Sequence, residues 1–222
     1  MATTTPQRHP PGPLRVALMP LLAWLMLVSA PVAAQSVVST RVTENAFGTA
    51  VIGLVENDTA QTIDVVRLSV TLLDAAGNAL ARQTGVPDLR VLAPGDRSPF
   101  TVTSFDPSRS ASATAASVDL RVRSAEAIPE VVTVRDVHAE PSTTGTRVTG
   151  TVVNLGDAPV DFIKVSATAL GPNDAVLATS SFYENVRTLA PSASMPFTVL
   201  LPGLLETPTA WLVRAYDGRS TP

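Results

Sequence analysis

Three metal-capable side chains alternate along one predicted strand, namely Asp136, His138 and Glu140. Residues two apart on a strand share a face, so the three could converge on a metal ion that supports hydrolysis. A zinc site also needs convergence and groups that orient its ligands, and His138 is the only histidine after residue 34. We favour the alternative, a solvent-facing strand surface, and expect neither a metal nor a cofactor.

The chain offers few residues that could form the activated nucleophile of a hydrolase. A Ser-His-Asp triad would have to use His138, and no Gly-x-Ser-x-Gly elbow is present to expose a serine. A Ser-Lys dyad would need Lys164, the only lysine, which alternates with Ser166 and Thr168. This spacing indicates a solvated charge on the polar face of a strand. The sequence therefore predicts that the protein is not an enzyme.

Binding chemistry has a few candidates of its own. Asn57-Asp58 and Asn173-Asp174 could supply oxygen ligands to calcium, although these residue types favour turns without any ion. Trp211 is interpreted as a core residue of the last strand rather than as a sugar-stacking platform. Tyr216 could lie exposed, but one ring is a poor platform for a glycan.

The elements that would position these residues belong to a sequence repeat that occurs twice in the chain. A shift of 97 residues aligns 51–102 with 148–199 without a gap, and 18 of the 52 positions are identical. Period-two alternation and frequent turn signals predict many short strands. We expect an all-β chain of two tandem immunoglobulin-like β-sandwich domains, over 35–125 and 131–222, joined by a linker at 126–130.

The repeated residues have structural explanations. A glycine inside a strand marks a bulge or the close approach of another backbone, an asparagine at a strand end forms an Asx turn, and a phenylalanine anchors the core. The pairs concerned are Gly53/Gly150, Asn57/Asn154 and Phe100/Phe197.

One difference between the two copies suggests a contact surface. Ile52 and Leu54 stand on the outward face of a strand in the first copy, where the second copy has Thr149 and Thr151. Apolar residues on a polar sheet face can mark a partner contact. The alternative is packing under a local loop or against the other domain.

Residues 1–34 have the pattern of a signal peptide. Arg8 and Arg15 precede an apolar run over 16–28, and small residues follow up to Ala34. We expect cleavage and export to the cell envelope, periplasm or exterior. If cleavage fails, the same segment could act as a membrane anchor. The chain has no cysteine and a net charge of −3, which excludes disulfides and gives no reason to expect nucleic-acid binding.

The repeated pattern resembles the FxLYD domain family. The residues that carry the resemblance are Val51-x-Gly-x-Val-x-Asn57, Leu72-Leu-Asp74, Gly77, Leu92-Ala-Pro-Gly95 and Pro99-Phe100. The second copy departs from it at Leu170-Gly171 and at Ser192. The family occurs largely in exported and membrane-linked prokaryotic proteins, and most of its members have no known function. The resemblance implies a fold and brings no catalytic residue.

Together these features predict a non-catalytic exported module that binds an envelope protein or a glycan, with Ile52 and Leu54 as a possible contact. Two alternatives stay open. One is a structural spacer held at the membrane by an uncleaved leader, and the other is a metal-dependent hydrolase.

Overall fold

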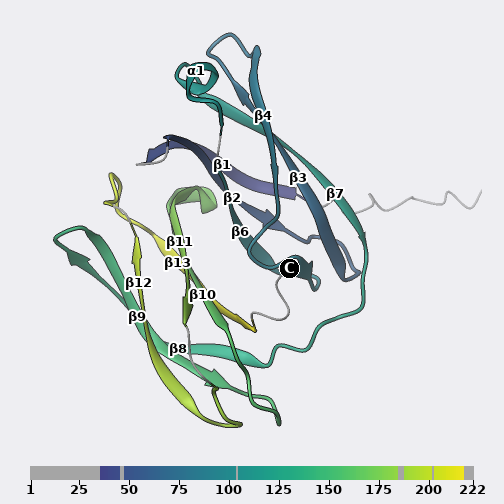
Figure 1. Ribbon diagram of the computed structural model, residues 1–222, viewed down its shortest axis with the longest axis vertical. Helices are drawn as coiled ribbons and strands as arrows, with labels where there is room; N and C mark the ends of the chain where they lie inside the picture. The colour runs from purple at the N-terminus through teal and green to yellow at the C-terminus, as the bar shows by residue number, and fades with distance from the viewer. Residues whose placement is uncertain (1–35, 46–47, 104, 185–187, 202, 218–222) are drawn as a thin grey trace, which may run out of the picture. The chain divides into compact units, whose positions relative to one another are not determined.

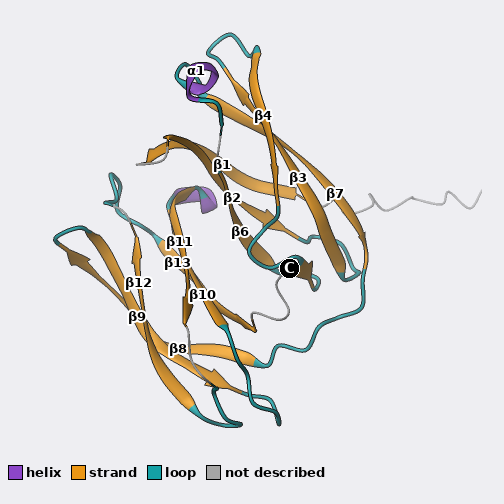
Figure 2. Cartoon of the chain, viewed as in Figure 1, coloured by secondary structure: helices purple, strands orange, loops and turns teal. Residues whose placement is uncertain are grey.

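The computed structural model describes residues 36–45, 48–103, 105–184, 188–201 and 203–217. In this part of the chain nearly all elements are β-strands, and every strand pair is antiparallel (Figure 2). The all-β class predicted from the sequence is therefore confirmed. None of the helices described here has the length and hydropathy of a membrane span. The signal peptide predicted over 1–34 lies outside the described residues.

The first set of sheets comes from residues 36–124 (Figure 1). One sheet has the order β1-β2-β6 and the other has the order β4-β3-β5, with β7 also paired to β3. The bounds are β1 (Ser36–Asn45), β2 (Gly48–Glu56), β3 (Ile63–Leu73), β4 (Ala79–Gly85), β5 (Val91–Leu92), β6 (Arg97–Val102), α1 (Pro107–Ser110) and β7 (Ala115–Ser124). A core cluster that includes Phe100, Leu68 and Leu72 joins the two sheets.

The second set of sheets comes from residues 132–217. Its sheets have the orders β12-β9-β8 and β11-β10-β13. The bounds are β8 (Val132–Ser142), β9 (Gly145–Asn154), β10 (Ile163–Leu170), a 3-10 turn η1 (Pro172–Asp174), β11 (Val176–Glu184), β12 (Ser194–Leu201) and β13 (Ala210–Asp217). A separate core cluster, which includes Phe197, Ile163 and Leu201, lies in this set.

Two strand glycines lie against another backbone, as the sequence predicts, and also against an aromatic ring. Gly53 pairs with Phe100 across β2 and β6, and Gly150 pairs with Phe197 across β9 and β12. A Cβ atom on Gly150 would come within 2.7 Å of the Phe197 ring and 2.9 Å of the Arg135 carbonyl oxygen. A side chain larger than hydrogen does not fit there without moving the ring or the neighbouring strand.

Asn57 and Asn154 make matching hydrogen bonds. Each Oδ1 atom accepts from a backbone N–H two residues later, at 3.1 Å for Thr59 and 2.9 Å for Gly156. Each Nδ2 atom donates to two backbone carbonyls, one of them 35 residues away. Both side chains are fully buried. The predicted Asx turns are confirmed, and each asparagine also links its turn to a distant segment of the chain.

Both faces of β10 are buried, although its sequence predicts one polar, solvent-facing side. Ile163 and Val165 point into the core cluster of the second set. On the opposite face, Lys164 and Ser166 are only 8% and 1% exposed. The prediction of an exposed face is wrong because this face lies against residues of the first set. Contacts over Ala33–Pro222 accordingly form one compact unit.

Candidate functional site

The metal-site hypothesis rested on three side chains that share a face, and the structure does not place them so. The pairing of β8 with β9 shifts between Arg135 and His138, and Asp136 has a φ of 52°. The bulge puts Arg135, rather than Asp136, in one row with His138 and Glu140. Glu140 accepts a hydrogen bond from Arg147 at 3.3 Å. In the part of the chain that the structure describes, no group of three or more His, Asp or Glu side chains could hold a metal ion.

Lys164, interpreted from the sequence as a solvated charge, is instead part of a buried ion pair. Its Nζ atom lies 2.8 Å from Oδ1 of Asp88, and the other oxygen of Asp88 accepts from the Ser166 hydroxyl at 2.8 Å. The Lys164 ammonium also lies 5.5 Å from the centre of the Tyr183 ring, within the range of a cation–π interaction. The ion pair between Lys164 of the second set and Asp88 of the first therefore links the two sets of sheets.

Ile52 and Leu54, the candidate partner contact, are buried within the chain. Ile52 is 6% exposed and Leu54 is 0% exposed. They form a small apolar cluster with Leu170 and Val176 of the second set. This arrangement is the alternative left open by the sequence, namely packing against the other half of the chain. We do not propose either residue as a contact for an external partner.

Further polar contacts surround this apolar cluster. Arg97 of the first set donates to Glu56 at 2.9 Å and, across the junction, to Asp174 at 3.0 Å. The Ser39 hydroxyl donates to the backbone carbonyl of Asp174 at 3.1 Å and accepts from the Val176 N–H at 3.0 Å. The carboxylate of Asp174, considered above as a calcium ligand, is thus engaged by Arg97. We call this whole contact between the two sets the junction.

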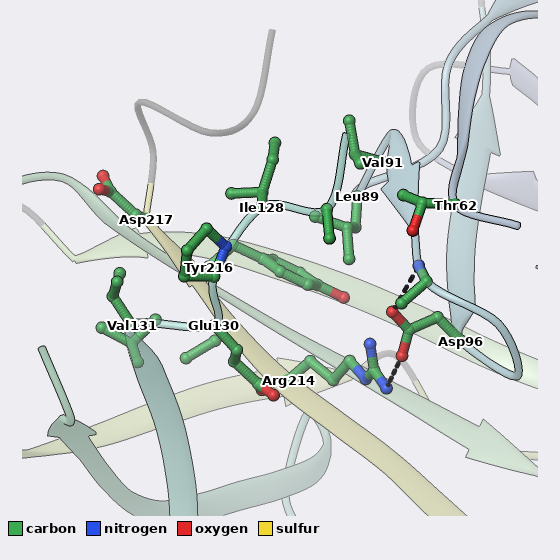
Figure 3. A pocket seen from close by; sticks show the side chains of 15 residues that line it. Thr62, Leu89, Val91, Asp96, Ile128, Glu130, Val131, Arg214, Tyr216 and Asp217 are labelled. Carbon is green, nitrogen blue, oxygen red and sulfur yellow. Dashed lines mark hydrogen bonds and ion pairs between the residues drawn. The ribbon is translucent and has the colours of Figure 1, made fainter. Parts of the chain in front are cut away.

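A pocket opens at the junction beside the linker 126–130 (Figure 3). Its cavity volume is about 80 Å³. Apolar walls come from the linker itself and from segments before and after it, including Leu89, Ile128 and Val131. Its polar part comes from Arg214 and Asp96, whose side chains are joined by a 2.8 Å hydrogen bond.

Tyr216 of β13 forms part of the pocket wall, and its hydroxyl points toward the side where Asp96 and Arg214 lie (Figure 3). The residue is only 5% exposed, and no hydrogen-bond partner contacts its buried hydroxyl. Burial raises the pKa of Tyr216 well above its ordinary value, and the nearby carboxylate of Asp88 adds to this effect. The hydroxyl therefore keeps its proton, and with almost no accessible surface of its own it lies behind the wall of the cavity.

Arg214 remains a cation beside this hydroxyl. Burial by itself would lower the pKa of Arg214, but the hydrogen bond and the charge of Asp96 outweigh that effect and raise it. The second oxygen of Asp96 accepts from the backbone N–H of Ala93 at 3.0 Å. Both oxygens of Asp96 are thus engaged by the protein itself.

The sequence analysis missed this pocket, although one signal for it was available. Trp211 and Val213 pack against the core of the second set, as predicted for Trp211. Strand alternation then places Leu212, Arg214 and Tyr216 on the opposite face of β13. The sequence left open that Tyr216 could lie exposed, whereas the structure buries it. What lies opposite the face depends on contacts between distant segments, and strand periodicity does not report those.

No protein-family profile and no curated protein matches the chain. Among solved structures, the chain is similar to a transglutaminase from red sea bream, with 14% sequence identity and a TM-score of 0.26. The match covers 83% of this chain and 29% of the transglutaminase, so the chain spans less than a third of that protein. The resemblance to the FxLYD family stays a prediction from the sequence.

Proposed function

We propose that the protein is a non-catalytic, exported binding module, made of two tandem immunoglobulin-like repeats of the FxLYD kind. Its partner is an envelope protein or a glycan, and the contact is made at the junction pocket. The single observation that carries this proposal is the pocket beside the linker, whose walls combine apolar side chains with the hydrogen-bonded pair of Arg214 and Asp96.

The side chains that could have done chemistry support a non-catalytic role. The bulge at Asp136 takes that carboxylate out of the row formed by His138 and Glu140. Lys164 is paired with Asp88, and the Ser166 hydroxyl donates to the other oxygen of the same carboxylate, so neither group stands in an open cleft. The residues that could have been nucleophile or ligand therefore serve the fold.

The junction itself favours a second candidate, the membrane-tethered spacer. The contacts of Lys164 with Asp88, of Arg97 with Asp174 and of the Ile52–Leu54 cluster with Leu170 would keep the two sets from moving independently. A stiff body of this kind suits a spacer held by an uncleaved leader. N-terminal sequencing of the native protein distinguishes the two roles, because a start at Gln35 removes the anchor.

Site-specific photo-cross-linking in cells tests the binding role. A benzophenone amino acid replaces Ile128, which is 46% exposed at the pocket, or Leu200, which is 45% exposed and lies outside it. We expect a discrete adduct from position 128 and none from position 200, and we expect the isolated partner to bind the purified wild-type protein. Equal adducts at both positions, or none at 128, would contradict the proposal.

A further inference from the structure

Among the described residues, four arginines gather on the outward face of the sheet that contains β3 and β7. Arg67 on β3 lies directly opposite Arg121 on β7, and Arg123 follows two residues along β7. Arg90, from the segment before β5, joins Arg123 beside Asp64. The chain as a whole has a net charge of −3, so this face concentrates positive charge on a protein that is otherwise negatively charged.

One end of this face already holds a carboxylate. The Arg90 guanidinium donates to both oxygens of Asp64 at 3.0 Å, and Arg123 donates to one of them at 2.9 Å. The side chain of Asp64 is 6% exposed, whereas that of Arg123 is 69% exposed. Two guanidinium groups from different segments therefore share one carboxylate, through the charge-assisted hydrogen bonds that arginine favours.

Arg67 and Arg121 have no such carboxylate. Both side chains are exposed, and across the described residues neither makes an ion pair or a hydrogen bond. Like charges that lie directly opposite on antiparallel strands destabilise the pair. Asp119, two residues from Arg121 on the same face, lies 3.8 Å from Arg82 of β4. The facing arginines are thus left without a compensating charge of their own.

We infer that this face binds a polysaccharide that carries carboxylates, and that one of its carboxylates pairs with Arg67 and Arg121 as Asp64 pairs with Arg90 and Arg123. The basis is charge complementarity and the arrangement around Asp64, which shows that two arginines of this face can converge on one carboxylate. The inference goes beyond the proposed function, since none of the four arginines lines the junction pocket.

The other side chains of this face favour a sugar polymer over a membrane or an acidic peptide. Thr71 of β3, Thr84 of β4 and Ser117 of β7 share the face, and their hydroxyls can bond those of a sugar. A surface for a membrane or a peptide would add exposed large apolar side chains that insert or anchor. In the described chain, the exposed large hydrophobic residues lie outside β3, β4 and β7.

Titration of the purified protein with polygalacturonate tests the inference. We expect saturable binding that weakens at least about tenfold between about 50 and 200 mM salt, because salt screens exposed charges. Arg67→Gln together with Arg121→Gln should weaken the binding at low salt by at least about tenfold. This double variant should keep the wild-type free energy of unfolding or raise it slightly, since it removes a repulsion and no partner.

Arg109→Gln together with Arg135→Gln is the matched control, because it removes the same charge from exposed arginines of α1 and β8. Its affinity for polygalacturonate should stay within about twofold of the wild type. Equal weakening in the two double variants would show that only net charge matters and would overturn the inference. Absence of polygalacturonate binding would do the same, as would equal binding of uncharged dextran.

Polyglutamate and vesicles that contain phosphatidylglycerol represent the other partners. At the same concentration of negative charge, each should bind at least about tenfold more weakly than polygalacturonate. Equal or tighter binding of either would assign this face to an acidic polypeptide or to a membrane and would overturn the inference. The cross-link at position 128 reports on the junction pocket alone, so failure of the proposed function and failure of this inference are distinguishable.

Discussion

Arg67 of the first set and Lys164 of the second stand 97 residues apart at matching positions of the aligned segments, in opposite environments. Arg67 on β3 lies opposite Arg121 on β7, and both side chains are exposed. Lys164 on β10 lies opposite Tyr216 on β13, and both are buried. The equivalent strand position therefore faces solvent in the first set and the junction in the second.

The matching residues that are identical show what the difference means. Gly53 and Gly150 both lie against a phenylalanine ring, and Asn57 and Asn154 both close a turn and hold a distant carbonyl. These residues, which build each set of sheets, are shared, whereas junction residues such as Leu54, Asp88 and Lys164 have no identical counterpart in the other copy. The features specific to this protein lie where the two copies differ.

The largest loss of stability is expected from substitutions at glycines that occur at matching positions in both sets. Gly53→Val and Gly150→Val each force a side chain into a phenylalanine ring and the neighbouring backbone. Each should lower the free energy of unfolding by at least about 3 kcal/mol, measured by urea denaturation. Gly203→Ala is the control, because nothing lies within 4 Å of the added Cβ, and its effect should stay within about 0.5 kcal/mol. A loss of less than about 1 kcal/mol in the free energy of unfolding at either strand glycine would contradict the claim that both copies lack room for a side chain there.

The next largest loss of stability is expected from a junction residue that differs between the two sets. Leu54 is fully buried at the junction, so Leu54→Ala should lower the free energy of unfolding by about 3 kcal/mol. Its counterpart is Thr151, which is partly exposed, and Thr151→Ala should change that free energy by less than about 1 kcal/mol. Thermal or urea unfolding measures both. If Leu54→Ala left stability unchanged but weakened partner binding, Leu54 would face a partner instead of the junction.

Lys164 and Arg67 offer a similar contrast. Lys164→Met leaves the carboxylate of Asp88 without its cation and should lower the free energy of unfolding by about 2 kcal/mol, less than for a fully buried pair because Asp88 keeps some exposure. Arg67→Met should have an effect within about 0.5 kcal/mol. Adding Asp88→Leu to Lys164→Met should restore part of the loss. Equal losses in the two single variants would show that the junction does not depend on this pair.

Replacing Tyr216 should have the smallest effect on the free energy of unfolding at neutral pH and a larger effect at alkaline pH. Burial raises its pKa in the folded protein above the ordinary 10.0 of the unfolded chain. The resulting stability is fully present below about pH 10 and is lost above it, at about 1.4 kcal/mol per pH unit. Tyr216→Phe should therefore flatten the decline of the free energy of unfolding between pH 10 and 11.

Tyr183→Phe is the matched control for this measurement, because Tyr183 is exposed. At pH 7, Tyr216→Phe should change stability by less than about 1 kcal/mol, since the hydroxyl has no partner to lose. Parallel decline of wild type and Tyr216→Phe above pH 10 would show that the hydroxyl is hydrated.

Strand periodicity and the internal alignment were enough to predict the all-β class, the close approach at Gly53 and Gly150, and the Asx turns. These features depend on contacts that one copy makes with itself. The same rules were wrong for Lys164 and Tyr216, because alternation separates two faces of a strand without saying what covers the second. The bulge at Asp136 was also missed, although it shifts the alternation by one residue: Val134 and Val137, three positions apart, both pack against the core.

The most direct test of a junction that joins both sets is the calorimetric unfolding of the purified protein. If the contacts of Lys164, Arg97 and Leu54 hold the sets together, residues 36–217 should unfold in one transition with equal calorimetric and van't Hoff enthalpies. Fluorescence of Trp211, which packs against the core of the second set, should change at the same temperature. Two resolved transitions, with Trp211 following only one, would contradict the account.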